Sequence, residues 1–243
     1  TNITEGTGTA ITGAAPSGFA SGDRLLAWIV QDTSGTTISG PSGEGWSKIA
    51  DANTSAPADG QTATVWEKKS ATGSETFAFT SSSAKRAIIQ VIALTGRHAT
   101  SAAIVSTPTI SNTLQGTPIS VAVTGLTALA GDDLLWFGNI DQKTATDTWS
   151  FGAISGFTNL QNVGNGNWLS SATFKSENVA AGATGTLTSV ATRTGSSNGS
   201  WSGVVVAIPT GASGPTVTSV TQTSGGTEGS PAVMTVALSG ATS

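Results

Sequence analysis

Short runs of Val, Ile, Thr, Phe and Trp, broken by Gly, Ser, Asn and Pro, fill most of this 243-residue chain. No window of about 12 residues shows sustained helical periodicity. Such a pattern is typical of many short β-strands joined by turns, and it predicts an all-β fold. The predicted strands are 24–31, 46–50, 63–69, 76–80 and 87–95 in the first half, and 119–123, 133–140, 157–160, 169–175, 185–189 and 203–208 in the second.

Two of these runs are apolar on both faces, namely "RLLAWIV" at 24–30 and "AIIQVIAL" at 87–94. Their length and their Gly-bounded ends favour buried central strands over helices. The run "TATVWEKK" at 62–69 alternates instead, and neither of its faces is wholly apolar. This alternation predicts an outer strand.

Four landmarks of the first half recur in the same order in the second half. The offset of roughly 110 residues is too long for a solenoid repeat and suits a β-sandwich of ~100 residues. The order and the spacing indicate a tandem duplication. The matching stretches are "GDRLL" (22–26) with "GDDLL" (131–135), "GWSKI" (45–49) with "GFTNL" (156–160), "VWEKKSATG" (65–73) with "TFKSENVAAG" (173–182), and "AIIQVIALTG" (87–96) with "VVVAIPTG" (204–211).

We therefore predict two jelly-roll-like β-sandwich domains, at 1–97 and 98–211, the second a divergent repeat of the first. The stretch "GASGP" at 211–215 has the composition of a hinge. Residues 212–243 then read as a linker and two opening strands of an incomplete module. The stretch "TEGSPAVMTVALSG" resembles the opening of immunoglobulin-like and Calx-β modules of bacteria and phages.

Composition argues against several classes of protein. Charged residues make up 10% of the chain, and the net charge is −4 with no basic stripe, so a nucleic-acid partner is not expected. The polar N-terminal stretch "TNITEGTGTAITG" is neither a signal peptide nor a membrane span, so no membrane partner is expected. With no Cys, disulfides and thiolate metal sites are excluded.

Catalytic signals are weak. His98 is the only histidine, and no Gly-x-Ser-x-Gly elbow occurs. The acids near aromatic residues are Glu44, Glu67, Asp141 and Asp147, and the sequence does not pair them into a glycosidase site. No phosphate-cradling motif precedes a helix, so no cofactor is expected. The sequence therefore predicts a non-enzymatic protein with no catalytic residue.

Acidic residues give no metal-site spacing either. Asp23 and Asp132 each follow a Gly and precede a strand, where an Asp side chain closes a turn on its own backbone. This interpretation is favoured over a calcium site, and no metal ligand is predicted.

Two tryptophans are candidate contacts with a glycan or a partner protein. Trp149 lies in "TWSF" at 148–151 and Trp168 in "GNGNW" at 164–168. Neither stretch has a clear counterpart in the first half. Loops in which the two copies differ are therefore where a function specific to this chain is expected, although a Trp in a sandwich more often packs in the core.

The repeated set resembles a module of bacteriophage virion proteins and related bacterial surface proteins. It runs Gly-Asp-x-Leu-Leu-aromatic, then Gly-Trp-x-x-Ile/Leu, then "VWEKK", then "SETFAFTSSSAKRAIIQVIALTG". The resemblance implies a structural or surface-attachment unit and no catalytic residue. The expected function is a capsid decoration protein on the virion surface that binds the major capsid protein. The alternative is a tail-fibre, adhesin or carbohydrate-binding module, extracellular or on a cell surface, and the oligomeric state stays open.

Overall fold

The computed structural model describes residues 2–54, 60–97, 100–142, 149–164, 169–193, 199–210, 216–224 and 233–239. Every regular element within these ranges is a β-strand, so the predicted all-β class is confirmed. In the described ranges no helix is long and apolar enough to cross a membrane.

The strands of the first half are β1 (Asn2–Thr12), β2 (Arg24–Gln31), β3 (Ile38–Ser39), β4 (Ser47–Asp51), β5 (Thr62–Lys68) and β6 (Ala78–Leu94). Those of the second half are β7 (Ile104–Val105), β8 (Thr109–Gln115), β9 (Ile119–Val123), β10 (Thr127–Ala128), β11 (Asp133–Gln142), β12 (Trp149–Phe151), β13 (Thr158–Gly164), β14 (Leu169–Ser176), β15 (Gly182–Ala183), β16 (Leu187–Arg193) and β17 (Gly199–Ile208). Two further strands follow, β18 (Thr216–Ser224) and β19 (Val233–Ser239).

The chain divides into two compact units, Thr1–Thr210 and Gly211–Ser243. In the smaller unit β18 and β19 pair antiparallel, which confirms the two strands predicted after residue 212. The larger unit contains both predicted sandwich regions, so the boundary predicted between residues 97 and 98 lies inside one compact unit.

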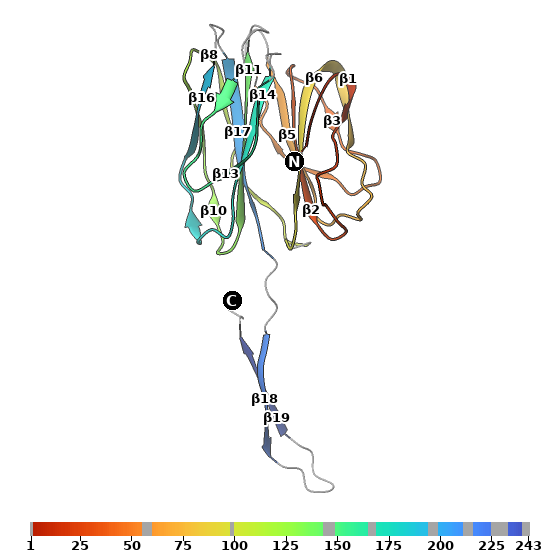
Figure 1. Ribbon diagram of the computed structural model, residues 1–243, viewed down its shortest axis with the longest axis vertical. Coiled ribbons are helices and arrows are strands. Elements are labelled where there is room, and N and C mark those ends of the chain that lie inside the picture. The colour runs from red at the N-terminus through yellow and green to blue at the C-terminus, as the bar shows by residue number, and fades with distance from the viewer. Residues whose placement is uncertain are drawn as a thin grey trace. The chain divides into compact units, whose positions relative to one another are not determined.

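The first sheet has the strand order β1-β6-β2-β5-β4, with β3 paired to β6, and it occupies the red-to-yellow side of Figure 1. β2 lies inside this sheet and all eight of its residues are buried, as the run "RLLAWIV" predicts. A strand buried on both faces has no need of polar alternation. Its side chains enter two different cores: Leu26, Trp28 and Val30 point to one, and Leu25, Ala27 and Ile29 to the other.

β6 is a single strand of 17 residues where the sequence predicts two strands. Pairing with β1 and β3 extends the strand across the serines at 81–83, where the sequence predicts a break between two strands. Its start lies over β5, because the rings of Phe79 and Trp66 are 5.6 Å apart. The bent strand therefore gives the first half a core of its own, which contains Ile11, Ile38 and Phe79.

β5 was predicted as an outer strand, and this prediction is wrong. β5 pairs with β2 on one side and β4 on the other, and all seven of its residues are buried. The alternating polar side chains are tolerated because they have partners. Thr64 accepts a hydrogen bond from the indole of Trp66, at 3.1 Å, and Glu67 pairs with Arg24.

The second half contains two sheets, on the green-to-blue side of Figure 1. The second sheet has the order β13-β14-β11-β17-β7, with β8 paired to β17, and the third has the order β12-β16-β9. β10 and β15 form a separate two-stranded sheet. Side chains of the second and third sheets share a core that contains Trp136, Trp149 and Trp201.

A third core joins the two halves and is called the joint core below. It combines Leu26, Trp28 and Val65 of the first sheet with Leu135 and Phe137 of the second, among others. The first and second sheets therefore pack face to face. Each half has one core of its own, and the joint core makes residues 1–210 one unit.

The repeated Gly-Asp stretches adopt the same local structure in both halves. Gly22 has φ of 91° and Gly131 has φ of 85°, a left-handed region that favours glycine. Both aspartates make the turn hydrogen bond that the sequence predicts. The matched bonds are Gly22 N to Ala71 O and Gly131 N to Val179 O, both 2.8 Å, and Ala20 N to Asp23 Oδ2 and Leu129 N to Asp132 Oδ2, both 2.9 Å.

The outermost strands β4 and β13 carry matching irregularities. The register of β4 against β5 shifts at Ile49, and that of β13 against β14 shifts at Leu160. Such a shift is a β-bulge, which bends a strand and interrupts its ladder. Both bulged residues pack against the joint core.

Candidate functional site

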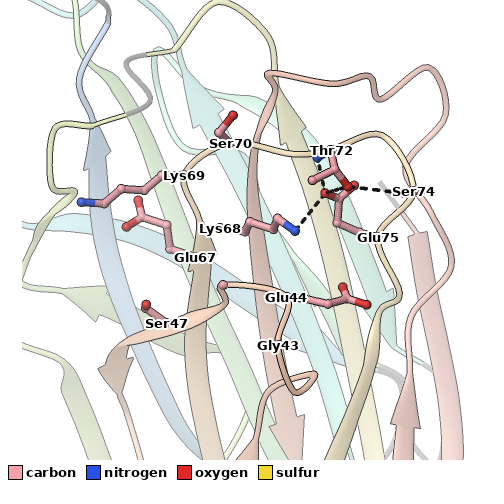
Figure 2. A pocket seen from close by; sticks show the side chains of 11 residues that line it. Gly43, Glu44, Ser47, Glu67, Lys68, Lys69, Ser70, Thr72, Ser74 and Glu75 are labelled. Atoms are coloured by element: carbon pink, nitrogen blue, oxygen red, sulfur yellow. Dashed lines mark hydrogen bonds and ion pairs between the residues drawn. The ribbon is translucent and has the colours of Figure 1, made fainter.

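A polar groove of about 760 Å³ lies at the end of β5, where two loops of the first half meet. One wall is the turn before β4, and the other is the loop between β5 and β6 (Figure 2). We call it the Glu75 groove. Its lining residues are Gly43, Glu44, Gly45, Ser47, Glu67, Lys68, Lys69, Ser70, Thr72, Ser74 and Glu75.

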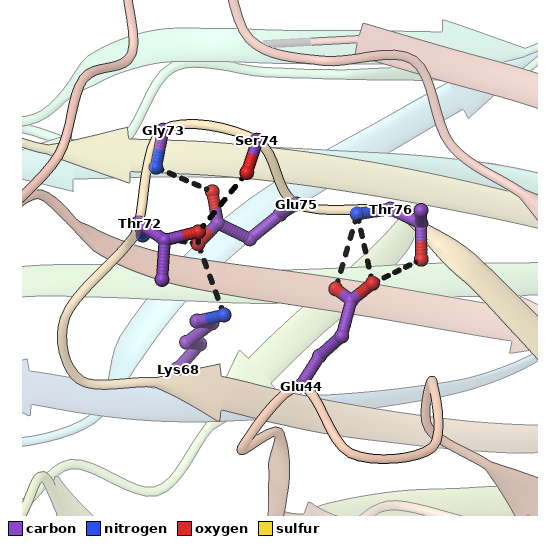
Figure 3. Close-up of polar contacts among 7 residues, drawn as sticks. All are labelled: Glu44, Lys68, Thr72, Gly73, Ser74, Glu75 and Thr76. Atoms are coloured by element: carbon purple, nitrogen blue, oxygen red, sulfur yellow. Dashed lines mark hydrogen bonds and ion pairs between the residues drawn. The ribbon is translucent and has the colours of Figure 1, made fainter.

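Glu75 holds the loop between β5 and β6 in place. Its carboxylate accepts hydrogen bonds from the backbone N–H and the hydroxyl of Thr72 and from the backbone N–H of Gly73, and it pairs with Lys68 at 2.9 Å (Figure 3). Burial acts to raise the pKa of Glu75. The backbone N–H of Thr72, the ammonium of Lys68 and the hydroxyl of Thr72 outweigh it and lower this pKa to about 2.

Glu44 links the opposite wall to the start of the next strand. Its carboxylate accepts two hydrogen bonds from the Thr76 backbone N–H, at 3.0 and 3.2 Å, and one from the Thr76 hydroxyl at 2.5 Å (Figure 3). A carboxylate bound to a backbone N–H makes a strong, charge-assisted hydrogen bond. The side chain of Glu44 therefore fixes the turn at 43–45 relative to Thr76.

The remaining charged residues of the groove also have partners. Glu67 is buried and forms an ion pair with the buried guanidinium of Arg24. Lys69 donates a hydrogen bond from Nζ to the backbone oxygen of Thr100, at 3.2 Å. In Figure 2 Lys68 points toward Glu75 and Lys69 points away from it. All three carboxylates of the groove therefore hold strands and loops together.

The low pKa of Glu75 does not suit a general acid. A general acid must carry a proton near neutral pH, and a carboxyl with a pKa near 2 is ionised there. A general base must be free to accept a proton, whereas Glu44 and Glu67 are held by Thr76 and Arg24. The free chemistry of the groove is hydrogen bonding by the exposed hydroxyls of Ser47 and Ser70.

A second groove, of about 400 Å³, lies at the matching place in the second half. It is lined by Gly156, Thr158, Leu160, Lys175, Ser176 and Glu177. Strand pairing makes Thr158 and Lys175 the counterparts of Ser47 and Glu67. The charge at this strand position is therefore inverted, from buried Glu67 to half-buried Lys175.

Asp133 provides the anion for this second groove. Its buried carboxylate accepts a hydrogen bond from Arg97 Nε at 2.8 Å and lies 3.8 Å from Lys175 Nζ. Lys175 also pairs with the exposed Glu177 at 2.5 Å. The hydrogen bond and the charge of Lys175 lower the pKa of Glu177.

Of the two predicted contact tryptophans, the structure describes Trp149. Trp149 is 1% exposed, and its ring packs in the core of the second half with the Arg193 guanidinium 5.2 Å from the ring centroid. A buried indole offers no free face on which a sugar could stack. Trp168 lies outside the described residues.

The acids named from the sequence lie in different places. Glu44 and Glu67 line the same groove, although 22 positions separate them, and Asp141 lies at the end of β11. Asp147 and His98 are outside the described residues. Glu75 was missed. The signal that could have found it is "KKSATGSE", where Ser, Thr and Gly between Lys68 and Glu75 form a turn that brings the two charges together.

Within the described ranges, no group of three or more His, Asp or Glu side chains is arranged to hold a metal ion. Comparison with known proteins finds no family model, no curated protein and no solved structure that matches this chain. The class defined by fold and site is an all-β protein of packed antiparallel sheets with a polar surface groove.

Proposed function

We propose that this chain is a non-enzymatic structural protein of a bacteriophage virion. It decorates the outer surface of the head and binds the major capsid protein there. The assignment to a virion derives from the sequence resemblance of the repeated module, and the placement on the head derives from the tandem sandwich regions, the few charges, the lack of a cofactor motif and the immunoglobulin-like start after residue 212. The structure supports the non-enzymatic, contact-making part of the proposal.

One observation carries that part. Each carboxylate of the Glu75 groove is held by a structural partner, namely Thr76, Arg24 or Lys68. An enzyme of this size would need at least one acid, base or nucleophile that is free to react. The carboxylates of the groove instead hold strands and loops in place, as expected of a structural protein.

The outer face of the third sheet supports contact with another protein. β16 presents exposed Thr188, Val190 and Thr192, and the neighbouring β9 presents exposed Ser120 and half-buried Ala122. None of these side chains is charged, so packing against a protein surface removes no charge from water. Hydroxyl and methyl groups on a sheet face suit hydrogen-bonded, closely packed contacts.

Immunogold electron microscopy of purified phage particles tests the location. Antibodies raised against the full chain should label the heads of intact particles. Label on the tails would overturn the head location and support the tail-fibre alternative. Particles without label would overturn the virion assignment altogether.

Particles stripped of the protein test its mechanical role. They should lose resistance to heat and to osmotic shock, and adding the purified chain back should restore it. Stripped particles with full resistance would refute a cementing role.

A further inference from the structure

The faces of the first and second sheets that form the joint core carry matched positions. In the first sheet Trp28 lies between Val65 and Gln90 on the neighbouring strands. In the second sheet Phe137 lies between Thr173 and Val204 in the same way. The repeated Leu-Leu stretch defines this correspondence, because Leu26 of β2 and Leu135 of β11 occupy equivalent positions in their sheets. Val65 therefore corresponds to Thr173, Trp28 to Phe137, and Gln90 to Val204.

The two faces meet about an approximate twofold axis. Trp28 and Phe137 occupy matched positions, and their rings contact each other at 5.5 Å between centroids. A contact between a matched position and itself is what a twofold axis produces. The correspondence of positions then assigns to every other contact across the interface a mate, which is the pair of positions in which the two sheets exchange roles.

Polar contacts across the interface have apolar mates. Thr173 donates a hydrogen bond to Gln90, and the mate of this contact is Val65 with Val204. Of those four residues, the two polar ones contact each other, and the two apolar ones are both part of the joint core. Two further polar contacts across the interface have apolar mates. Trp28 Nε1 donates to Ser171 Oγ at 2.9 Å, and the mate of this contact is Phe137 with Ala63, both in the joint core. Asn139 donates to Gln61, and the mate of this contact is Val30 with Leu169, both in the joint core.

The charged residues at one end of the interface also differ between the matched positions of the two sheets. The first sheet has Arg24 on β2 and Glu67 on β5, joined as a buried ion pair. The matched positions of the second sheet are Asp133 and Lys175. The cation and the anion have exchanged strands. A pair of two first-sheet faces, or of two second-sheet faces, would place like charges at matched positions. The pair of one first-sheet face and one second-sheet face places opposite charges there.

We propose that these two faces form a heterotypic docking pair: each accepts the other face of the same chain, and two faces of one kind reject each other. In a pair of two first-sheet faces, Gln90 would face Val65 and the indole N–H of Trp28 would face Ala63. Each buried polar group would then lack a partner. Leaving one such group unsatisfied lowers an association or folding constant by roughly 5- to 150-fold.

Substitutions that preserve the composition of the full chain test this proposal. Q90V/V204Q moves one glutamine to its matched position, so that valine faces Thr173 and glutamine faces Val65, as in a pair of like faces. The quadruple variant V65T/Q90V/T173V/V204Q contains the same residues as the natural chain but restores polar with polar and apolar with apolar.

Urea unfolding followed by Trp fluorescence gives the folding constant of each variant. Q90V/V204Q should lower it by about 30-fold or more, because two contacts are mismatched. The quadruple variant should return to within about 5-fold of the natural chain. Q90V/T173V, which makes both contacts apolar, is the control and should stay close to the natural chain.

Two results would overturn the proposal. One is a quadruple variant as unstable as Q90V/V204Q, which would mean that the volume or the position of each side chain matters and the match does not. The other is Q90V/V204Q with the stability of the natural chain. If Q90V/V204Q fails to fold, recovery of a folded quadruple variant still decides the question.

Discussion

Replacement of Glu75 by glutamine should remove a charge-dependent part of the stability. The pKa of Glu75 falls from 4.5 to about 2 in the folded protein. At about 1.4 kcal/mol per pKa unit, this corresponds to at most about 3.5 kcal/mol. The side chain borders an open groove, where solvent screening reduces the value, so we expect E75Q to lose roughly 1–2 kcal/mol at pH 7.

The pH dependence identifies the charge as the cause. Glu75 has a depressed pKa, so its contribution is fully present above pH 4.5 and is lost as the pH falls toward about 2. The free energies of unfolding of the natural chain and of E75Q should therefore differ most above about pH 5. They should converge as the pH falls to about 2, because protonated Glu75 resembles glutamine.

Denaturant unfolding at a series of pH values measures both curves. E177Q is the matched control, since the Glu177 side chain is 57% exposed and should contribute less than about 0.5 kcal/mol. A gap between E75Q and the natural chain that stays constant from pH 7 to pH 2 would refute the charge argument. The absence of any gap at pH 7 would refute the role of Glu75 in holding the loop.

Three further outcomes are expected from substitutions in the larger unit, each measured as the free energy of unfolding. W149A should lose about 3–5 kcal/mol, because Trp149 is a core residue, and a stable W149A would contradict its burial. R24M should lose about 3–5 kcal/mol by leaving Glu67 buried without its cation, and R24M/E67L should recover most of this loss. G22A and G131A should each lose about 1–2 kcal/mol from backbone strain, because both φ values are in the left-handed region. G131A should lose at least as much as G22A, because a Cβ at residue 131 would lie 3.0 Å from Thr210 Oγ1 whereas the space around Gly22 is open; a G131A variant clearly more stable than G22A would contradict this reasoning.

Local sequence patterns correctly predicted the strands whose burial follows from the apolar pattern of their own residues. β2 and β9 have the predicted bounds, 24–31 and 119–123. β1 was not predicted, because its Thr- and Gly-rich sequence has no apolar pattern. It forms a strand by pairing with β6, whose partner residues lie 66 to 89 positions away. Pairing between distant segments overrides weak local preference.

The candidate site depended even more on distant contacts. The burial of Trp149 depends on the third sheet packing on the second, and the loop "TWSF" carries no sign of that packing. Glu44 and Glu67 were named as acids near aromatic residues, but their partners Thr76 and Arg24 are 32 and 43 positions away. A sequence shows that such residues exist, and only the fold shows what they bind.

The bulges at Ile49 and Leu160 protect two edges of the sheets. A regular outermost strand is a template on which the same strand of a neighbouring molecule can add. Each bulge interrupts the ladder of β4 or β13, and its apolar residue packs against the joint core. Straightening either strand, by deletion of Ile49 for example, should therefore favour edge-to-edge pairing between copies of the chain and aggregation.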